Sequence, residues 1–250
     1  MTLHIGIVAC SAEGAALCYR TLCDEGAAIL GPHMHPEVSL HNHPLGTYMR
    51  HVRSDDWEGV AGLMRSSADK LEAMGAELLI CPDNTIHQAY EQATADSKIP
   101  WLHIADEVAA AARRAGYRNL GVLGTRYLMT GPVYTDALAR EGLECSVPEP
   151  PDRDLLDQVI FDELVYGEFV EVSRLYVTKM IRRLAERGCD AVVLGCTEIP
   201  LLIAEGDSPL PTLDSTRILA RAALALATEG EMTVAESIAE GESLDDEDDF

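Results

Sequence analysis

The chain has 250 residues, 47% of them hydrophobic, and a formal net charge of −23. This length suffices for one large or two small domains with a buried core. The strong negative charge argues against nucleic acids and anionic membranes as partners, because both need a basic protein surface. No run approaches the roughly 20 uninterrupted apolar residues of a membrane helix. Seven cysteines without a CxxC spacing indicate free thiols. Since the first residues do not resemble a signal peptide, we expect a cytoplasmic protein.

The chain opens with a strand-like run at residues 5–11, and a similar run, with a glycine in the same place, follows at residues 120–126. Short apolar runs that end in small residues are typical of buried parallel strands. A second matching unit follows each run: a helical apolar pattern, a glycine, an acidic residue, an apolar strand and a polar loop. Gly75 and Gly188 are the glycines of these units, and they lie nearly equally far from the runs before them. The order and spacing indicate an internal repeat.

The repeat predicts an α/β fold of two pseudo-symmetric halves. Each half is expected to be a small, mainly parallel sheet flanked by helices, with the active site in the cleft between the halves. We expect residues 1–100 plus 212–230 in the first half and 101–211 in the second. The run 213–219 predicts a helix that is capped by Asp214 or Ser215 and packs back on the first half. The acidic segment 231–250 predicts a disordered tail.

The alignment of Gly75 with Gly188 places Asp83 opposite Cys196, because each lies eight residues beyond its glycine. The carboxyl ends of parallel strands line the crevice in which open α/β sheets bind ligands. Two reactive side chains from equivalent loops are therefore expected to face each other across the cleft.

Two motifs in these loops resemble those of the aspartate/glutamate racemase superfamily. The run Gly-Cys-Thr-Glu at 195–198 resembles the second catalytic motif of that family, and Asp-Asn-Thr-Ile-His at 83–87 resembles the first, which normally begins with cysteine. With the opening strand and the run 120–125, the resemblance covers roughly residues 3–228. It implies an amino acid racemase or epimerase that uses no cofactor or metal, acts on an amino acid or related carboxylate, and forms a homodimer.

The family chemistry needs a base on one face of the substrate and an acid on the other, because an α-proton is removed and returned. The resemblance implies that Cys196 and Asp83 are the catalytic pair. It also implies that small polar groups hold the substrate carboxylate and stabilise the enolate-like transition state. We assign that role to Ser11, Asn84, Thr85, Thr125 and Thr197.

Asp83 departs from the family pattern, and three interpretations stay open. Asp83 replaces the missing thiol as second acid/base, and would then need a raised pKa to act as the acid. Alternatively, Asp83 binds a substrate ammonium while Cys196 acts alone in a one-base decarboxylase or lyase. In the third interpretation the protein binds a small carboxylate without turnover. Cys81 cannot simply replace the thiol, because it lies about 6–7 Å back along the strand. For Cys196, the alternative to catalysis is a buried core cysteine.

Other polar residues allow two interpretations each. His87 either tunes Asp83 or donates to the substrate, or is a satisfied histidine at a helix N-terminus; Glu198 either orients Cys196 or caps its helix. The histidines of residues 33–43 could ligate a metal, but their spacing favours a polar loop or a subunit contact. Arg50 and Arg53 are either cations for a distal substrate carboxylate or surface residues.

Overall fold

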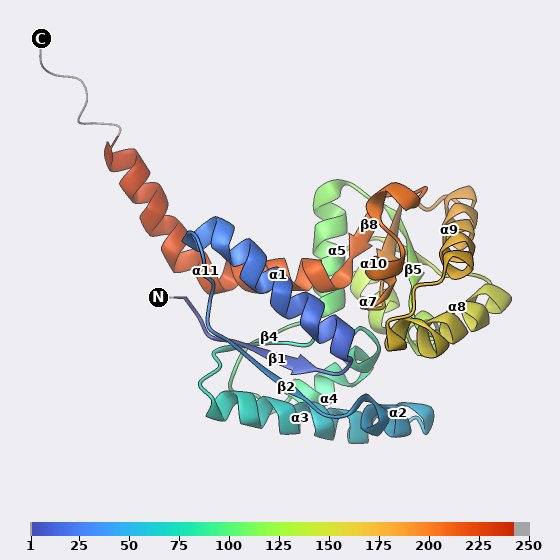
Figure 1. Ribbon diagram of the computed structural model, residues 1–250, viewed down its shortest axis with the longest axis horizontal. Helices are drawn as coiled ribbons and strands as arrows, with labels where there is room; N and C mark the ends of the chain where they lie inside the picture. Colours follow the sequence, from blue (N-terminus) through green and yellow to red (C-terminus); the bar gives the residue numbers. More distant parts are fainter. Residues whose placement is uncertain (1, 243–250) are drawn as a thin grey trace, which may run out of the picture.

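The structure, a computed structural model that describes residues 2–242, contains two four-stranded parallel sheets (Figure 1). The strand order is β2-β1-β3-β4 in the first sheet and β6-β5-β7-β8 in the second. The strands of the first sheet are β1 (Ile5–Ala9), β2 (Val38–Asn42), β3 (Leu78–Ile80) and β4 (Trp101–Leu102). Those of the second are β5 (Asn119–Leu123), β6 (Glu144–Ser146), β7 (Ala191–Leu194) and β8 (Thr212–Asp214). The matching orders confirm the predicted α/β fold with two pseudo-symmetric halves.

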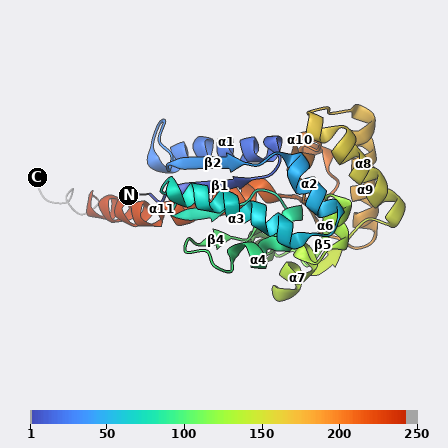
Figure 2. The ribbon, with the colours of Figure 1, turned by 90° about the horizontal axis from the view of Figure 1, so that it is seen from below.

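Helices cover both faces of each sheet, because the strands are apolar on both sides (Figure 2). In the first half, α1 (Ala12–Leu30) packs on one face, and α2 (Leu45–Arg53) and α3 (Trp57–Ala73) pack on the other. In the second half, α5 (Ile104–Ala115) and α7 (Val133–Arg140) cover one face, and α8 (Pro150–Asp162) and α9 (Glu171–Glu186) cover the other. Shorter helical segments complete the loops: η1 (Thr85–Ala89), α4 (Tyr90–Thr94), α6 (Arg126–Thr130), η2 (Leu164–Tyr166), α10 (Ile199–Leu202) and η3 (Glu205–Asp207).

The two glycines that define the repeat follow the ends of α3 and α9. Gly75 and Gly188 both have φ of 93°, a conformation that favours glycine. Each therefore turns the chain from a helix into the central strand that carries a site loop. In α9 the buried face starts at Ser173, whereas the preceding residue, Val172, is 72% exposed although it is apolar.

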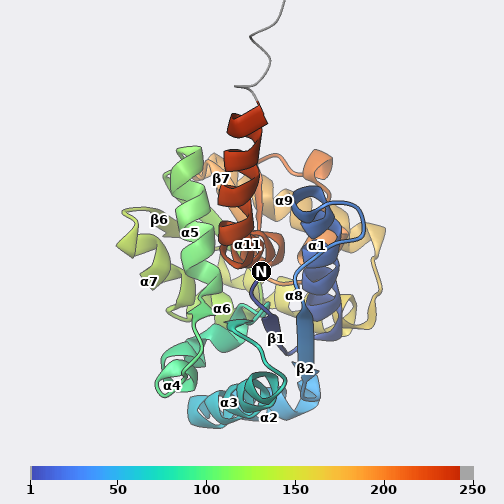
Figure 3. The same ribbon diagram turned by 90° about the vertical axis from the view of Figure 1, so that its left-hand side faces the viewer.

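The chain crosses between the halves next to residues 101 and 212. Residues 101–102 pair with β3 in the first sheet, and residues 212–214 pair with β7 in the second. Each fourth strand is then followed by a helix that packs on the other half: α5 packs with β5 and β7, and α11 (Ser215–Glu242) packs with β1, β3 and α1. Figure 3 shows α11 between α1 and α5. The region 213–219, for which the sequence predicts such packing, thus begins a helix that lies against the first half.

Helix α11 continues to Glu242, and so includes residues 231–242 of the segment for which the sequence predicts a tail. The remainder of that predicted tail, residues 243–250, lies outside the described residues. Within residues 2–242, no helix is both long and apolar enough to cross a membrane.

Candidate active site

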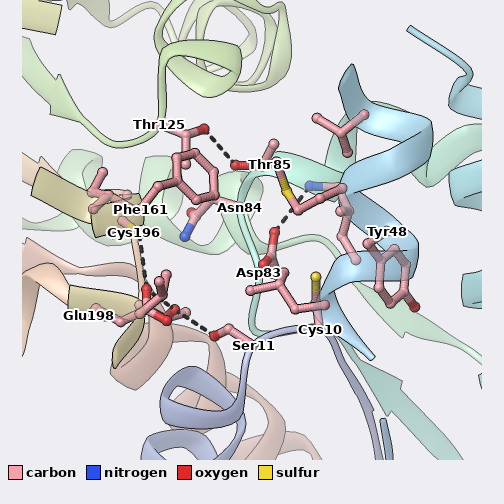
Figure 4. A pocket seen from close by; sticks show the side chains of 18 residues that line it. Cys10, Ser11, Tyr48, Asp83, Asn84, Thr85, Thr125, Phe161, Cys196 and Glu198 are labelled. Carbon is pink, nitrogen blue, oxygen red and sulfur yellow. Dashed lines mark hydrogen bonds between the residues drawn. The ribbon is translucent and has the colours of Figure 1, made fainter. Parts of the chain in front are cut away.

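A pocket lies where the central strands of both sheets end, and it brings together most of the predicted site residues (Figure 4). The empty space in and around it, counted together with the open solvent at its mouth, is about 500 Å³. Its polar lining consists of Cys10, Ser11, Asp83, Asn84, Thr85, Thr125, Cys196, Thr197 and Glu198. Asp83 and Cys196 therefore line one cavity, each on the loop that follows the central strand of its half.

Cys196 is buried at the end of β7, and its thiol donates a hydrogen bond to Glu198. The Sγ–Oε2 distance is 3.0 Å, and the Thr197 hydroxyl donates to the same oxygen over 2.7 Å. Burial raises the pKa of Cys196 well above its ordinary value, and the negative charge of Glu198 raises it further. The thiol is thus protonated at neutral pH, with a carboxylate in place to accept its proton. Glu198 Oε1 is buried and has no hydrogen-bond partner among the described residues.

Asp83 occupies the equivalent place after β3 and is only partly buried. Its Oδ1 accepts a hydrogen bond of 3.1 Å from the backbone N–H of Ile86. Burial raises the pKa of the Asp83 carboxyl; the Ile86 N–H bond lowers it in part, and the nearby Glu198 raises it. This direction is the one that an aspartate needs to exchange protons near neutral pH.

Cys10 is a site residue that sequence reasoning missed. Its buried thiol lies beside Asp83 (Figure 4), and the two groups influence each other's pKa: Asp83 raises the pKa of the Cys10 thiol, and the thiol lowers that of the Asp83 carboxyl. Cys10 follows Gly6 by four residues, as Thr125 follows Gly121. Counting residues from equivalent glycines, which paired Asp83 with Cys196, thus also pairs Cys10 with Thr125, a predicted site residue. The same count could therefore have identified Cys10.

Hydroxyl groups join the two halves across the pocket. The hydroxyls of Ser11 and Thr197 are 3.1 Å apart, and those of Thr85 and Thr125 are 2.8 Å apart. Ser11 and Thr125 also cap helices, since they accept hydrogen bonds from the backbone N–H groups of Gly14 and Leu128. These four hydroxyls hold the helix starts and the site loops in one network.

Asn84 makes a third link between the halves and is almost fully buried. Its Nδ2 donates to the Ser215 hydroxyl over 3.0 Å, and its Oδ1 accepts from the Tyr134 hydroxyl over 2.6 Å. Ser215 in turn donates to the carbonyl of Leu194 at the end of β7. Asn84 therefore positions the Asp83 loop against the end of β7, the strand that precedes Cys196.

His87 supports the Asp83 loop from behind and does not line the pocket. Its Nδ1 lies 2.6 Å from the carbonyl oxygen of Asp83, and its Nε2 accepts the backbone N–H of Ile104. Burial lowers the pKa of His87 to about 3, so the ring is neutral and donates from Nδ1. Both ring nitrogens are occupied, so His87 does not donate to a ligand in this arrangement.

The other candidates from the sequence lie outside the pocket. Arg50 and Arg53 are exposed on α2 and are absent from the pocket lining. In the histidine-rich segment, His41 and His43 hydrogen-bond to the hydroxyls of Ser67 and Ser66 on α3. Among the described residues, no group of three or more His, Cys, Asp or Glu side chains is arranged to hold a metal ion.

This arrangement provides opposite proton-transfer properties on the two sides of one pocket. Cys196 is a protonated thiol with an adjacent carboxylate, and Asp83 is a carboxyl group whose pKa is raised. A substrate C–H group between them could lose a proton to one side and gain a proton from the other.

Comparison with known proteins agrees with this geometry. A family model described as Asp/Glu/Hydantoin racemase matches residues 7–223. The crystal structure of a Yersinia pestis protein assigned to the Asp/Glu racemases is 31% identical, with a TM-score of 0.82, and the match covers 91% of this chain and 99% of that one. An aspartate racemase homologue from Pyrococcus horikoshii is 27% identical, with a TM-score of 0.79 and coverage of 91% and 100%.

Among curated relatives, a glutamate racemase of a Roseiflexus species is 31% identical over 140 residues, or 54% of this chain. The match spans 49% of that enzyme, about half its length. The family match itself extends across both halves and includes both site loops. The chain therefore belongs to the Asp/Glu/hydantoin racemase family.

Proposed function

We propose that this protein is a cofactor-independent amino acid racemase or epimerase that exchanges the α-proton between Asp83 and Cys196. The observation that carries the proposal is that a carboxyl group and a thiol, from equivalent loops of the two halves, line one pocket. Family membership supports the reaction class. The shifted pKa values support the assignment of these two residues as acid and base.

In one direction, the Asp83 carboxylate removes the α-proton and becomes neutral, while the Cys196 thiol protonates the opposite face of the α-carbon and becomes a thiolate. The other enantiomer reacts with this second form of the enzyme and restores the first. Glu198 can take up or return the thiol proton, because its Oε2 accepts the Sγ–H. Each proton leaves one named group and arrives at another, so the cycle balances.

The remaining lining groups fit the two ends of an amino acid. The Glu198 Oε1 atom, which lacks a partner among the described residues, is suited to accept a hydrogen bond from the ammonium group. The hydroxyls of Ser11, Thr85, Thr125 and Thr197 and the Asn84 amide are suited to bind the carboxylate and its enolate-like form. We assign His87 a supporting role, because it holds the Asp83 carbonyl.

The test is proton NMR in D₂O with each enantiomer of a panel of amino acids. With two bases, newly formed product carries deuterium at the α-carbon while recovered substrate keeps its proton. Cys196→Ala and Asp83→Asn should each lower the rate by about 10²–10⁴-fold. Cys145→Ala and Asp136→Asn, which change residues outside the pocket, are the matched controls.

Two outcomes would contradict the two-base mechanism. Deuterium in both substrate and product from the start would indicate one base, as in the decarboxylase or lyase alternative. Full activity of the Asp83→Asn variant would show that the carboxyl group is not the second base, and would leave it at most a role in substrate binding. No α-proton exchange with any amino acid would refute the proposed reaction for the panel.

We also propose that the protein is a cytoplasmic homodimer. All seven cysteines are free, which supports a reducing compartment. A group of apolar side chains is exposed around the start of α9 and supports contact with a second copy: Tyr166, Phe169, Val170, Val172 and Leu175. Light scattering should give about twice the chain mass of 27.1 kDa, and Val172→Glu should shift the protein towards the monomer.

A further inference from the structure

Besides the polar loops, apolar side chains from two helical regions line the pocket. One wall comes from α2 and the other from the end of α8 and η2. The apolar side chains are Leu45, Met49 and Val52 on the first wall, where Tyr48 also lines the pocket, and Ile160, Phe161 and Val165 on the second. Phe161 lies at the pocket in Figure 4, on the side where Cys196 and Thr125 are labelled. A pocket with such an apolar lining is suited to an apolar group of the ligand.

The charged side chains that line the pocket are all acidic. Among the described residues that line it, none is Lys, Arg or His, whereas Asp83 and Glu198 are acidic. Arg50 and Arg53 are close in sequence to the pocket residues of α2, but both are exposed and neither lines the pocket. A carboxylate on a substrate side chain would therefore enter an apolar space without a counter-ion, near two acidic groups. Such a buried, unpaired charge is strongly disfavoured.

We infer that the substrate is an amino acid with an uncharged, apolar side chain, which lies between α2 and the α8–η2 wall. This inference rests on the proposed function and names its substrate class. The polar loops hold the ammonium and carboxylate groups that all amino acids share. The two apolar walls then decide which side chain is accepted, because a leucine or methionine side chain gains contacts there and an acidic side chain loses its hydration without compensation.

The first experiment compares pairs of similar shape and different charge: leucine with aspartate, and methionine with glutamate. We expect kcat/KM for the apolar member to be about 100-fold higher or more. The variant Met49→Lys places a cation in the α2 wall and should shift the ratio towards glutamate by about 10-fold or more. Met74→Lys is the matched control, because Met74 is 58% exposed at the end of α3 and outside the pocket; this variant should leave the ratio unchanged.

A binding measurement separates this inference from the proposed reaction. Calorimetry with the Cys196→Ala protein should show leucine binding at least about 10-fold more tightly than aspartate, whether or not the wild-type protein racemises either. Tighter binding of leucine together with no α-proton exchange would refute the reaction and support the side-chain preference. Racemisation with aspartate or glutamate preferred would support the reaction and overturn the preference. Leucine binding no more tightly than aspartate, including no detectable binding of either, would also overturn it.

Discussion

The link through Asn84 allows a quantitative test of how the two halves are held together at the site. Asn84→Ala removes the hydrogen bonds to the hydroxyls of Tyr134 and Ser215, both of which are buried. Ser215 keeps its bond to the Leu194 carbonyl, whereas the Tyr134 hydroxyl loses its hydrogen bond of 2.6 Å to Asn84 Oδ1. A buried donor without a partner costs about 1–3 kcal/mol, and loss of the second bond costs about 1 kcal/mol. We therefore expect the free energy of unfolding to fall by roughly 2–4 kcal/mol.

Thermal unfolding and urea titration measure this change. For a protein of this size, each kcal/mol corresponds to about 2–4 °C in Tm, so the midpoint should fall by on the order of 10 °C. A double-mutant cycle with Tyr134→Phe isolates the pair, because phenylalanine removes the hydroxyl that Asn84→Ala would leave unpaired. Asn84→Ala should cost about 1–2 kcal/mol less in the Tyr134→Phe background. If the two effects add to within about 0.5 kcal/mol, the claim that this bond joins the halves is refuted.

Three further predictions follow from the site. Glu198→Gln removes a charge that raises the pKa of Cys196, so alkylation of Cys196 by iodoacetamide at pH 7 should be faster than in the wild type; an unchanged or slower rate would contradict the proposed pairing. Asp83→Asn should raise Tm at neutral pH, because burial raises the pKa of Asp83 and its ionised form costs stability. The gain should disappear as the pH falls through the folded-state pKa to the unfolded value, where the wild-type carboxyl is neutral as well; a pH-independent gain would point to another cause. Gly14→Ala should lower Tm and racemase activity together, because the added Cβ would lie 2.4 Å from Thr197 Cβ, and full activity would contradict this packing.

The sequence predicted the core of the site because its pattern is local and repeated. Gly75 and Gly188 both follow a helix and precede a central strand, so a count of eight residues reaches Asp83 and Cys196. Equal spacing from an equivalent turn places residues at equivalent points of two parallel sheets. This is why the pocket could be predicted without tertiary information.

Other features depend on contacts between distant parts of the chain. The strand at residues 101–102 is too short to show a periodic pattern, so its place in the first sheet could not be predicted. The partner of His87 Nε2 is the backbone N–H of Ile104, the first residue of α5. The two residues become neighbours only when the chain folds back past the Asp83 loop. The exposure of Arg50 and Arg53 depends on which face of α2 packs on the sheet. Local patterns carry no information on these pairings.

The contacts that join the halves are also the groups suited to bind a substrate carboxylate. The Ser11–Thr197 and Thr85–Thr125 pairs are hydroxyl–hydroxyl bonds, each worth only about 0.5–1.5 kcal/mol. A carboxylate forms stronger, charge-assisted bonds with the same hydroxyls. Substrate binding can therefore replace weak contacts between the halves with stronger contacts through the ligand. Asp83 and Cys196 are on different halves. A ligand that joins the halves therefore also sets the distance between these two residues, across which its own α-proton must be transferred.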